Sequence, residues 1–261
     1  MKKIAALILA LALALTLAAC GGTGPAPASG TPSDGGLDGS SVPRDSDGAA
    51  ISYGEYSAAE IGAEVTVETY VQAKQVWRDG KTSLYTQSEE GAYFIYQLAC
   101  TRDEYDSLAV GTKLRVTGTK SEWSGETEIT DASYEVLDGA FIADPIDLTA
   151  VAGGDELAAH RDKMASFRGM TVEAITDKNG KEAAFLYNWD GAGAEGDDLY
   201  FNASVDGNTI NFTVESDFCG AESSVYKAVK ELKVGDVIDI TCFLYWYNGP
   251  NPHVFIVKPA A

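Results

Sequence analysis

Alternation of apolar and polar residues predicts β-strands along this chain, and the same series of strands occurs twice. In the first half the alternating segments are residues 63–71, 82–87, 93–98, 113–118 and 127–130. In the second half they are residues 171–173, 199–201, 209–214, 237–247 and 254–257. Period-two alternation is typical of strands that are buried on one face. The chain is therefore predicted to be mostly β and internally duplicated.

A short helix is expected between the third and fourth strands of each half. Thr101 and Glu104 have the spacing of a capping box, in which two side chains satisfy the free amides at a helix start. The matching segment of the second half, residues 224–232, carries apolar residues at the spacing of one buried helical face. Between the halves, Asp155 is expected to begin a connecting helix.

The N-terminal segment has the organisation of a secretory signal peptide. Lys2 and Lys3 precede an apolar run over residues 4–17, which is shorter than the roughly 20 residues that a membrane-spanning helix needs. The run ends in Leu-Ala-Ala-Cys at residues 17–20, which resembles the lipobox of bacterial lipoproteins. This resemblance implies cleavage before Cys20, lipidation of that cysteine, and a protein anchored on the extracytoplasmic face of a bacterial cell membrane.

Two matching segments carry a second resemblance. Residues 111–117 and 235–241 each begin with a glycine, continue with alternating apolar residues and end in a threonine. They resemble the fourth strand of OB-fold modules found in tandem on bacterial surface lipoproteins. The resemblance implies two OB-fold-like five-stranded Greek-key barrels, each with a short helix between strands 3 and 4. An immunoglobulin-like sandwich is the alternative, which the helices and the small number of strands disfavour.

These patterns divide the chain into five regions. Residues 20–50 are rich in Gly, Pro, Ser and Asp and hold almost no large apolar side chain, so a disordered tether is predicted there. The expected regions are a signal peptide (1–19), the lipidated cysteine and tether (20–50), a first OB-fold-like domain (51–140), a linker with a helix (141–166) and a second OB-fold-like domain (167–261).

The acidic composition bears on the partner. The chain has 19 Lys and Arg against 39 Asp and Glu, a net charge of −20, and loss of the signal peptide would remove two more lysines. Affinity for nucleic acid rests largely on Lys and Arg side chains that displace counterions from phosphate. We therefore expect nucleic acid to be disfavoured, and an oligosaccharide or a protein to be the partner.

Few residues suggest catalysis or metal binding. The sequence holds two histidines and no Cys-x-x-Cys, and we find no nucleophile-elbow, zinc-protease or phosphate-loop motif. We expect a protein that is not an enzyme and has no catalytic residues, metal or cofactor. With Cys20 lipidated, the remaining cysteines allow at most one disulfide, and Cys219 with Cys242 is the candidate pair.

The tryptophans indicate where a ligand could bind. All four fall near the strand ends at which OB-fold loops bind oligonucleotides or oligosaccharides. The candidate binding residues are Trp77, Trp123, Trp189, Tyr245, Trp246, Tyr247 and Asn248. A structural role is the alternative for each tryptophan, because aromatic residues also close barrel cores. Alternation along the last long strand directs Trp246 to the core and its tyrosine neighbours outward.

Together these features predict a membrane-anchored binding or adaptor module for an oligosaccharide or a protein partner. One alternative is a surface protein that binds single-stranded nucleic acid or assists a nuclease. Another is a purely structural component of an envelope complex. The sequence leaves the oligomeric state open.

Overall fold

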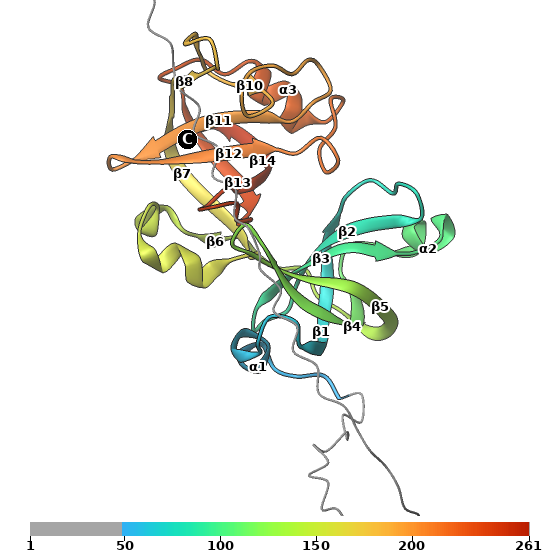
Figure 1. Ribbon diagram of the computed structural model, residues 1–261. Helices are drawn as coiled ribbons and strands as arrows, with labels where there is room; N and C mark the ends of the chain where they lie inside the picture. Colours follow the sequence, from blue (N-terminus) through green and yellow to red (C-terminus); the bar gives the residue numbers. More distant parts are fainter. Residues whose placement is uncertain (1–48, 261) are drawn as a thin grey trace, which may run out of the picture. The chain divides into compact units, whose positions relative to one another are not determined.

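The computed structural model describes residues 49–260 (Figure 1). The predicted signal peptide, Cys20 and almost all of the predicted tether lie outside these residues. Within residues 49–260, no helix combines the length and the apolar character that crossing a membrane requires.

The first barrel closes through pairing of its first and fourth strands. Its elements are β1 (Glu64–Lys74), β2 (Lys81–Gln87), β3 (Ala92–Ala99), α2 (Arg102–Ser107), β4 (Thr112–Trp123) and β5 (Glu126–Ala140). Around the barrel the strand order is β1-β2-β3-β5-β4. β1 pairs antiparallel with both β2 and β4, whereas β3 runs parallel to β5. The helix α2 lies between strands 3 and 4 and begins with the predicted capping box of Thr101 and Glu104.

The second barrel repeats this order. Its elements are β7 (Met164–Glu173), β11 (Leu199–Val205), β12 (Asn208–Val214), α3 (Ser224–Lys230), β13 (Val237–Phe243) and β14 (His253–Pro259). β7 pairs with both β11 and β13, and β12 runs parallel to β14. These pairings match those of the first barrel strand for strand. The predicted fold class, two OB-fold-like barrels in tandem, is therefore confirmed.

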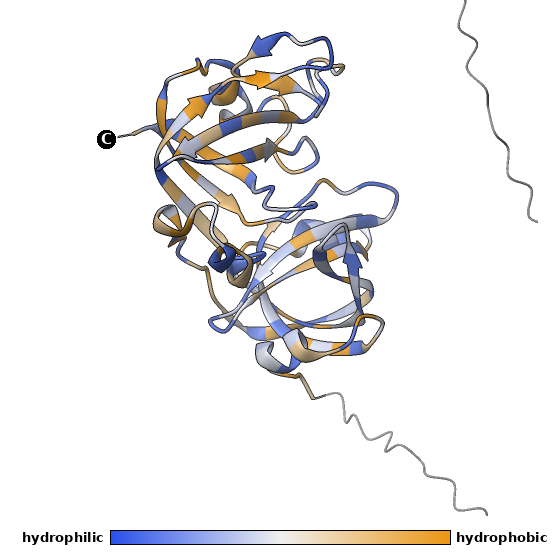
Figure 2. Cartoon of the chain, turned by 60° about the vertical axis from the view of Figure 1, so that its left-hand side comes forward, coloured by the Kyte–Doolittle hydropathy of each residue, from blue (hydrophilic) through white to orange (hydrophobic). Residues whose placement is uncertain are grey.

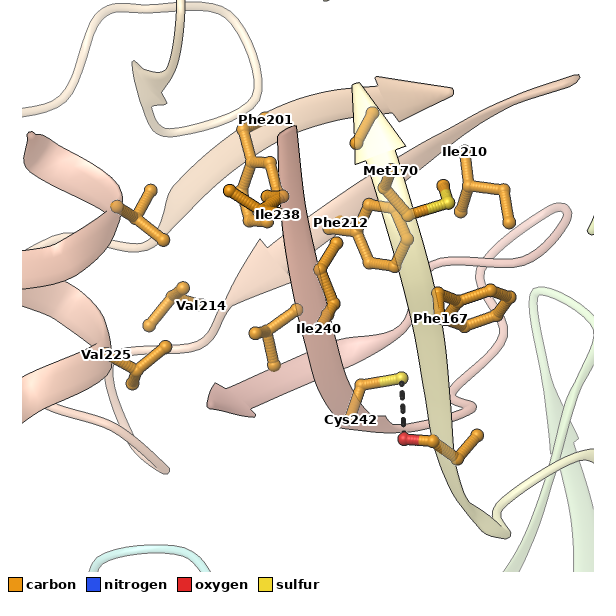
Figure 3. Packing of buried hydrophobic residues seen from close by; sticks show 14 of the residues in the cluster. Phe167, Met170, Phe201, Ile210, Phe212, Val214, Val225, Ile238, Ile240 and Cys242 are labelled. Atoms are coloured by element: carbon orange, nitrogen blue, oxygen red, sulfur yellow. Dashed lines mark hydrogen bonds between the residues drawn. The ribbon is translucent and has the colours of Figure 1, made fainter. Parts of the chain in front are cut away.

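Each barrel encloses its own apolar core, built from the inward side of the alternating strands. In the first barrel, Val65, Val67 and Val71 of β1 meet Leu114 and Val116 of β4. Figure 2 shows apolar and polar residues interleaved along the strands. In the second barrel, Phe167, Phe201, Phe212 and Ile240 are packed together with the side chain of Cys242, as Figure 3 shows. Burial of these alternate positions explains the period-two pattern in the sequence.

A helix that the sequence pattern did not predict precedes the first barrel. α1 (Tyr53–Ala58) begins with a second capping box, in which Ser52 and Glu55 exchange side-chain and backbone hydrogen bonds. Its buried Tyr56 packs edge-on against Tyr93, with ring centroids 4.8 Å apart. The helix thus adds aromatic side chains to the core of the first barrel.

The connector differs from the predicted α-helix. It consists of β6 (Ile146–Asp147) and two 3₁₀ helices, η1 (Thr149–Val151) and η2 (Asp155–His160). Leu157 anchors η2 in the core of the second barrel, and Asp155 makes no side-chain cap. Met164 and Ala165 begin β7. Between β7 and β11 the chain forms three two-residue strands, β8 (Ile175–Thr176), β9 (Glu182–Ala183) and β10 (Leu186–Tyr187).

An aromatic cluster joins the two barrels. Tyr85 of β2 and Phe94 of β3 form one buried cluster with Met164 of β7 and Phe243 of β13. The rings of Tyr85 and Phe243 are stacked, with centroids 4.5 Å apart and planes inclined by 14°. The outer face of β2 and β3 is therefore covered by the second barrel at these residues.

Phe212→Ala tests the core of the second barrel. Phe212 is fully buried, so truncation should lower the free energy of unfolding by about 3–5 kcal/mol through lost burial and a residual cavity. Urea denaturation measures this loss. Val237→Ala, at an exposed position of β13, is the control and should change stability by less than about 0.5 kcal/mol. Equal effects of the two substitutions would contradict the core assignment.

Candidate ligand groove

A groove with a volume of about 560 Å³ lies on the second barrel, over the outer face of β11 and β12. Its walls are the loop before β11, which carries Trp189, and the loop between β13 and β14, residues 244–252. In OB-folds this combination of strands and loops is the binding face. We call this feature the barrel-2 groove.

Aromatic rings line both walls of the barrel-2 groove. Trp189 is 75% exposed and Tyr247 is 51% exposed, so both offer ring faces to a ligand. Tyr200 contributes from β11. Tyr245 lies deeper, with its ring stacked on that of His253 at a centroid distance of 4.1 Å. A ligand with flat apolar faces could therefore stack on aromatic rings at both walls of the groove.

Three asparagines supply amide groups along the same groove. Asn251 donates from Nδ2 to the backbone and side-chain oxygens of Asn211, at 3.4 and 3.2 Å. Thr213 Oγ1 in turn donates to Asn251 Oδ1 at 3.1 Å. Asn248 is exposed at the tip of the loop, where its positive φ of 54° forms a tight turn. Amides both donate and accept, so this wall can match a ligand edge that carries both kinds of group.

A second groove, with a volume of about 490 Å³, begins on the first barrel. It is lined by Tyr96 of β3 and by the basic side chains of Arg78 and Lys81, among others. Glu215, Tyr245 and His253 line both grooves. The two grooves therefore share part of their lining, and we call the second one the barrel-1 groove.

A buried hydrogen-bond network marks the point where the grooves meet. Tyr85 Oη lies 2.6 Å from His253 Nδ1 and 3.1 Å from Glu215 Oε2. Gln75 Nε2 donates to both carboxylate oxygens of Glu215 at 2.7 Å. These bonds connect the first barrel to the second, and Gln75, Glu215 and His253 also line the barrel-1 groove.

Burial shifts the pKa values of His253 and Glu215 in this network. Burial lowers the pKa of His253 to about 3, so the imidazole is neutral at pH 7. The 3.5 Å contact between His253 Nδ1 and Glu215 Oε2 is for that reason not an ion pair. Burial also raises the pKa of Glu215 to about 7, although hydrogen bonds from Gln75 and Tyr85 oppose the shift. Glu215 can therefore be neutral when the groove is mildly acidic.

Charge is unevenly distributed along the two grooves. The barrel-2 groove is lined by the carboxyl groups of Asp198 and Glu215 and by no Lys or Arg side chain among the described residues. At the barrel-1 end, Arg78 pairs with Asp217 at 2.7 Å, and Lys81 lies 3.4 Å from the side-chain oxygen of Gln97. Positive charge is thus confined to one end.

The structure brings together four of the predicted binding residues and separates three. Trp189, Tyr245, Tyr247 and Asn248 all line the barrel-2 groove. The indole of Trp77 instead donates to the backbone oxygen of Cys100 at 2.9 Å, and Trp123 is exposed at the end of β4. Trp246 is half-buried, beneath the guanidinium of Arg161 at 4.5 Å, rather than in the barrel core.

The predicted disulfide is absent. Cys100, Cys219 and Cys242 are free thiols. Cys242 Sγ points from β13 toward the backbone oxygen of Ala165, 3.8 Å away (Figure 3). Burial raises the pKa of the Cys219 thiol to about 12, so it stays protonated and unreactive. Cys219 and Cys242 both belong to the core of the second barrel and are free there, so the pairing predicted from their sequence positions is not formed.

Sequence reasoning missed several groove residues. Tyr200 on β11, and Asn211 and Thr213 on β12, occupy alternate strand positions, opposite in parity to the core phenylalanines Phe201 and Phe212. Strand parity could have found them. Glu215 and His253 carried no such signal, because their role depends on contact with Tyr85 of the other barrel. Among the described residues, no group of three His, Cys, Asp or Glu side chains is placed to hold a metal ion.

Comparisons with known proteins give similarity in structure only. No protein-family model and no curated protein sequence matches the chain. A murine DNA-binding protein solved with double-stranded DNA shares 11% identity over 75% of this chain and 96% of its own, with a TM-score of 0.36. The single-stranded DNA-binding protein from Thermus aquaticus shares 11% identity over 77% and 95%, with a TM-score of 0.24.

A replication protein A heterotrimer bound to single-stranded DNA is also similar. It shares 11% identity over 76% of this chain, with a TM-score of 0.29. This chain spans 49% of that protein's matched chain, about half its length.

The printed descriptions of these structures run against the partner expected from composition. All three structures are described as DNA-binding or DNA-bound proteins, whereas we expected an oligosaccharide or protein partner and disfavoured nucleic acid. Net charge averages over the whole surface, so the expectation drawn from it does not describe any one groove. Contact depends on the side chains that line a groove, and here exposed rings, amides and two basic residues lie along one path.

Tyr85→Phe tests the network between the grooves. The substitution keeps the stacked ring but removes the hydroxyl, so the buried His253 Nδ1 loses its partner. We expect a loss of about 1–3 kcal/mol in the free energy of unfolding, measured by urea denaturation. The control is Tyr96→Phe, whose hydroxyl lies on the exposed surface, with an expected change below about 0.5 kcal/mol. A neutral Tyr85→Phe would show that the network does not stabilise the fold.

Proposed function

We propose that this protein binds single-stranded nucleic acid, with unpaired bases held in the barrel-2 groove. The observation that supports this most is the joint exposure of the Trp189 and Tyr247 rings in one groove. Every base has a flat face, and stacking of a base on an aromatic side chain contributes about 1–3 kcal/mol. A duplex hides these faces, so the proposal concerns single strands.

The asparagines support base recognition in the same groove. The edge of a base carries hydrogen-bond donors and acceptors side by side, and an asparagine amide can meet both. The side-chain amide of Asn248 is exposed at the loop tip, whereas Asn211 and Asn251 are held by each other and by Thr213. A base stacked on Trp189 or Tyr247 would present its edge toward this amide wall.

The charged side chains in the grooves predict which forces would drive binding. Phosphate contacts are limited to Arg78 and Lys81 in the barrel-1 groove, because among the described residues these are the basic side chains that line either groove, and carboxyl groups line both. Binding should therefore be driven by stacking and depend on salt far less than binding by proteins that neutralise many phosphates. The proposed role is binding without catalysis.

We further propose that the protein is a lipid-anchored lipoprotein on the extracytoplasmic face of a bacterial membrane. The support is the sequence of residues 1–20, with its two lysines, its apolar run and its lipobox-like end. A single acyl modification binds a membrane weakly, whereas two or three chains on one cysteine give stable anchoring.

Trp189→Ala should weaken binding of a short single-stranded oligonucleotide about 5- to 150-fold, the equivalent of one lost stacking contact. Fluorescence anisotropy of a labelled oligonucleotide measures the affinity, for residues 49–261 and for each variant. The matched control is Trp123→Ala, because Trp123 is 59% exposed but lines neither groove. Its affinity should equal that of the unsubstituted protein.

Two results would contradict the proposed function. One is the absence of saturable binding to any single-stranded oligonucleotide. The other is equal affinity for an intact and an abasic strand of the same length, since an abasic strand keeps its phosphates but offers nothing to stack.

Cys20→Ala tests the anchor. When the full-length precursor is expressed in a bacterium, the mature protein should partition into the detergent phase of a Triton X-114 extract. The Cys20→Ala variant should remain in the aqueous phase or retain its signal peptide. Cys100→Ala is the control and should partition like the unsubstituted protein. Aqueous partitioning of the unsubstituted protein would rule out lipid anchoring.

A further inference from the structure

Asp198 places a carboxyl group in the barrel-2 groove, directly before β11. Strand parity explains its direction. The next residue, Leu199, is fully buried in the core, whereas Asp198 and Tyr200 lie on the opposite side and line the groove. Leu199 pairs with Val214 of β12. The same register sets Asp198 opposite Glu215, the other carboxyl group that lines this groove.

The carboxyl group of Asp198 is held in one orientation. Its Oδ1 accepts from the backbone N–H of Ser216 at 2.8 Å and from the hydroxyl of Ser216 at 2.6 Å. Within residues 49–260 no donor bonds to Oδ2, and this oxygen is not enclosed by the protein. A carboxylate oxygen has two lone pairs and no hydrogen to donate. The bonds from Ser216 therefore use the lone pairs of Oδ1 and leave those of Oδ2 for a ligand.

The backbone of Asp198 is tied to the loop that carries Trp189. Its oxygen accepts from the N–H of Asn188 at 2.9 Å, and Asn188 immediately precedes Trp189 in the chain. The carboxyl group and the exposed indole therefore belong to the same end of the groove. We expect the edge of a base that stacks on Trp189 to meet Asp198.

The second carboxyl group of the groove is less available to a ligand. Both carboxylate oxygens of Glu215 accept from Gln75 Nε2 at 2.7 Å, and Oε2 also accepts from the hydroxyl of Tyr85 at 3.1 Å. A ligand that bonded to Glu215 would have to share or replace these contacts. Asp198 Oδ2 is thus the carboxylate oxygen of the groove that a ligand can use without disturbing a hydrogen bond of the protein.

The Watson–Crick edges of the bases differ in what they offer to a carboxylate. Guanine presents two adjacent donors, N1–H and the 2-amino group, which one carboxylate oxygen can accept together. Adenine and cytosine present one amino group beside a ring nitrogen that only accepts. Thymine and uracil present one N–H between two carbonyl oxygens, which a carboxylate repels. Hydrogen bonds to an ionised acceptor are the strong ones, so guanine gains most from this position.

We infer that Asp198 is the specificity-determining residue of the barrel-2 groove, and that the groove selects single strands with an unpaired guanine whose N1–H and 2-amino group donate to Asp198 Oδ2. The inference rests on the proposed function, because it concerns the same groove and the same class of ligand. Phosphate contacts position a strand, whereas base contacts specify it. A carboxyl group in a groove that no described Lys or Arg lines is therefore placed to read a base.

Exchange of one guanine for hypoxanthine tests the inference on the unsubstituted protein. Hypoxanthine lacks only the 2-amino group of guanine and keeps N1–H and the flat ring. A short oligothymidine strand with one central guanine should bind at least about fivefold more tightly than the same strand with hypoxanthine. Fluorescence anisotropy measures both affinities for residues 49–261, which contain both complete barrels.

Asp198→Asn tests the assignment of the residue. The backbone N–H of Ser216 requires an oxygen, so the asparagine oxygen takes the place of Oδ1 and its NH₂ group that of Oδ2. Donors would then face donors, and the preference for guanine over hypoxanthine should fall below about twofold. The matched control is Asp206→Asn, in the exposed turn between β11 and β12, which lines neither groove and should keep the full preference.

Each outcome decides a different claim. Equal affinity for the guanine and hypoxanthine strands would overturn the inference and leave the proposed function in place, since both strands would still bind. A preference for guanine that survives Asp198→Asn would overturn the role of Asp198. Absence of binding to either strand would overturn the inference together with the proposed function. Should Asp198→Asn fail to fold, the comparison of the two strands on the unsubstituted protein still decides whether the groove selects guanine.

Discussion

The stacked rings of Tyr85 and Phe243 fix the two barrels against each other, and the ligand groove depends on that contact. With Phe94 and Met164 they bury the outer face of β2 and β3, the face on which a lone OB-fold barrel binds its ligand. Aromatic pairs of this kind contribute about 0.5–1.5 kcal/mol beyond the burial of their area. Because the first barrel uses this face for packing, the open face of the second barrel becomes the main groove. The first barrel contributes the side chains that line the barrel-1 groove, among them Tyr96, Arg78 and Lys81.

Polar groups placed within this apolar contact determine how the groove is shaped. An apolar interface alone tolerates sliding, whereas buried hydrogen bonds require one arrangement to avoid unpaired groups. Tyr85 binds Glu215 and His253, which line the grooves, and Glu126 accepts a hydrogen bond from the Trp246 backbone beside the groove loop. The stability of the barrel pair and the geometry of the groove therefore share the same residues, so a substitution that separates the barrels should also distort the groove.

The sequence predicted the barrels well because their signals lie in neighbouring residues. These signals are the alternation of apolar and polar side chains and the glycines that precede strands. Residues 111–117 and 235–241 lead into β4 and β13, and the capping box at Thr101 begins α2. The relation between the barrels was not predicted, since it arises from residues far apart in the chain. In the structure five successive residues of β2 are buried, as in a strand covered on both faces, but Thr82, Ser83 and Thr86 among them are polar, so the sequence shows no continuous apolar run. In the barrel-2 groove, Trp189 and Tyr247 could be predicted because they are aromatic residues in loops. Glu215 could not, because its place in the hydrogen-bond network depends on Tyr85 of the first barrel.

Nuclear magnetic resonance of the tryptophan indole N–H groups, during titration with a short single-stranded oligonucleotide, tests the binding site most directly. Each of the four tryptophans gives one indole signal, and substitution assigns each signal to its residue. The account predicts a saturable shift of the Trp189 signal, while the signals of Trp77 and Trp123, which line neither groove, stay in place. Shifts at Trp123 or Trp77 without one at Trp189, or no shift at all, would contradict the barrel-2 groove as a binding site for single-stranded nucleic acid.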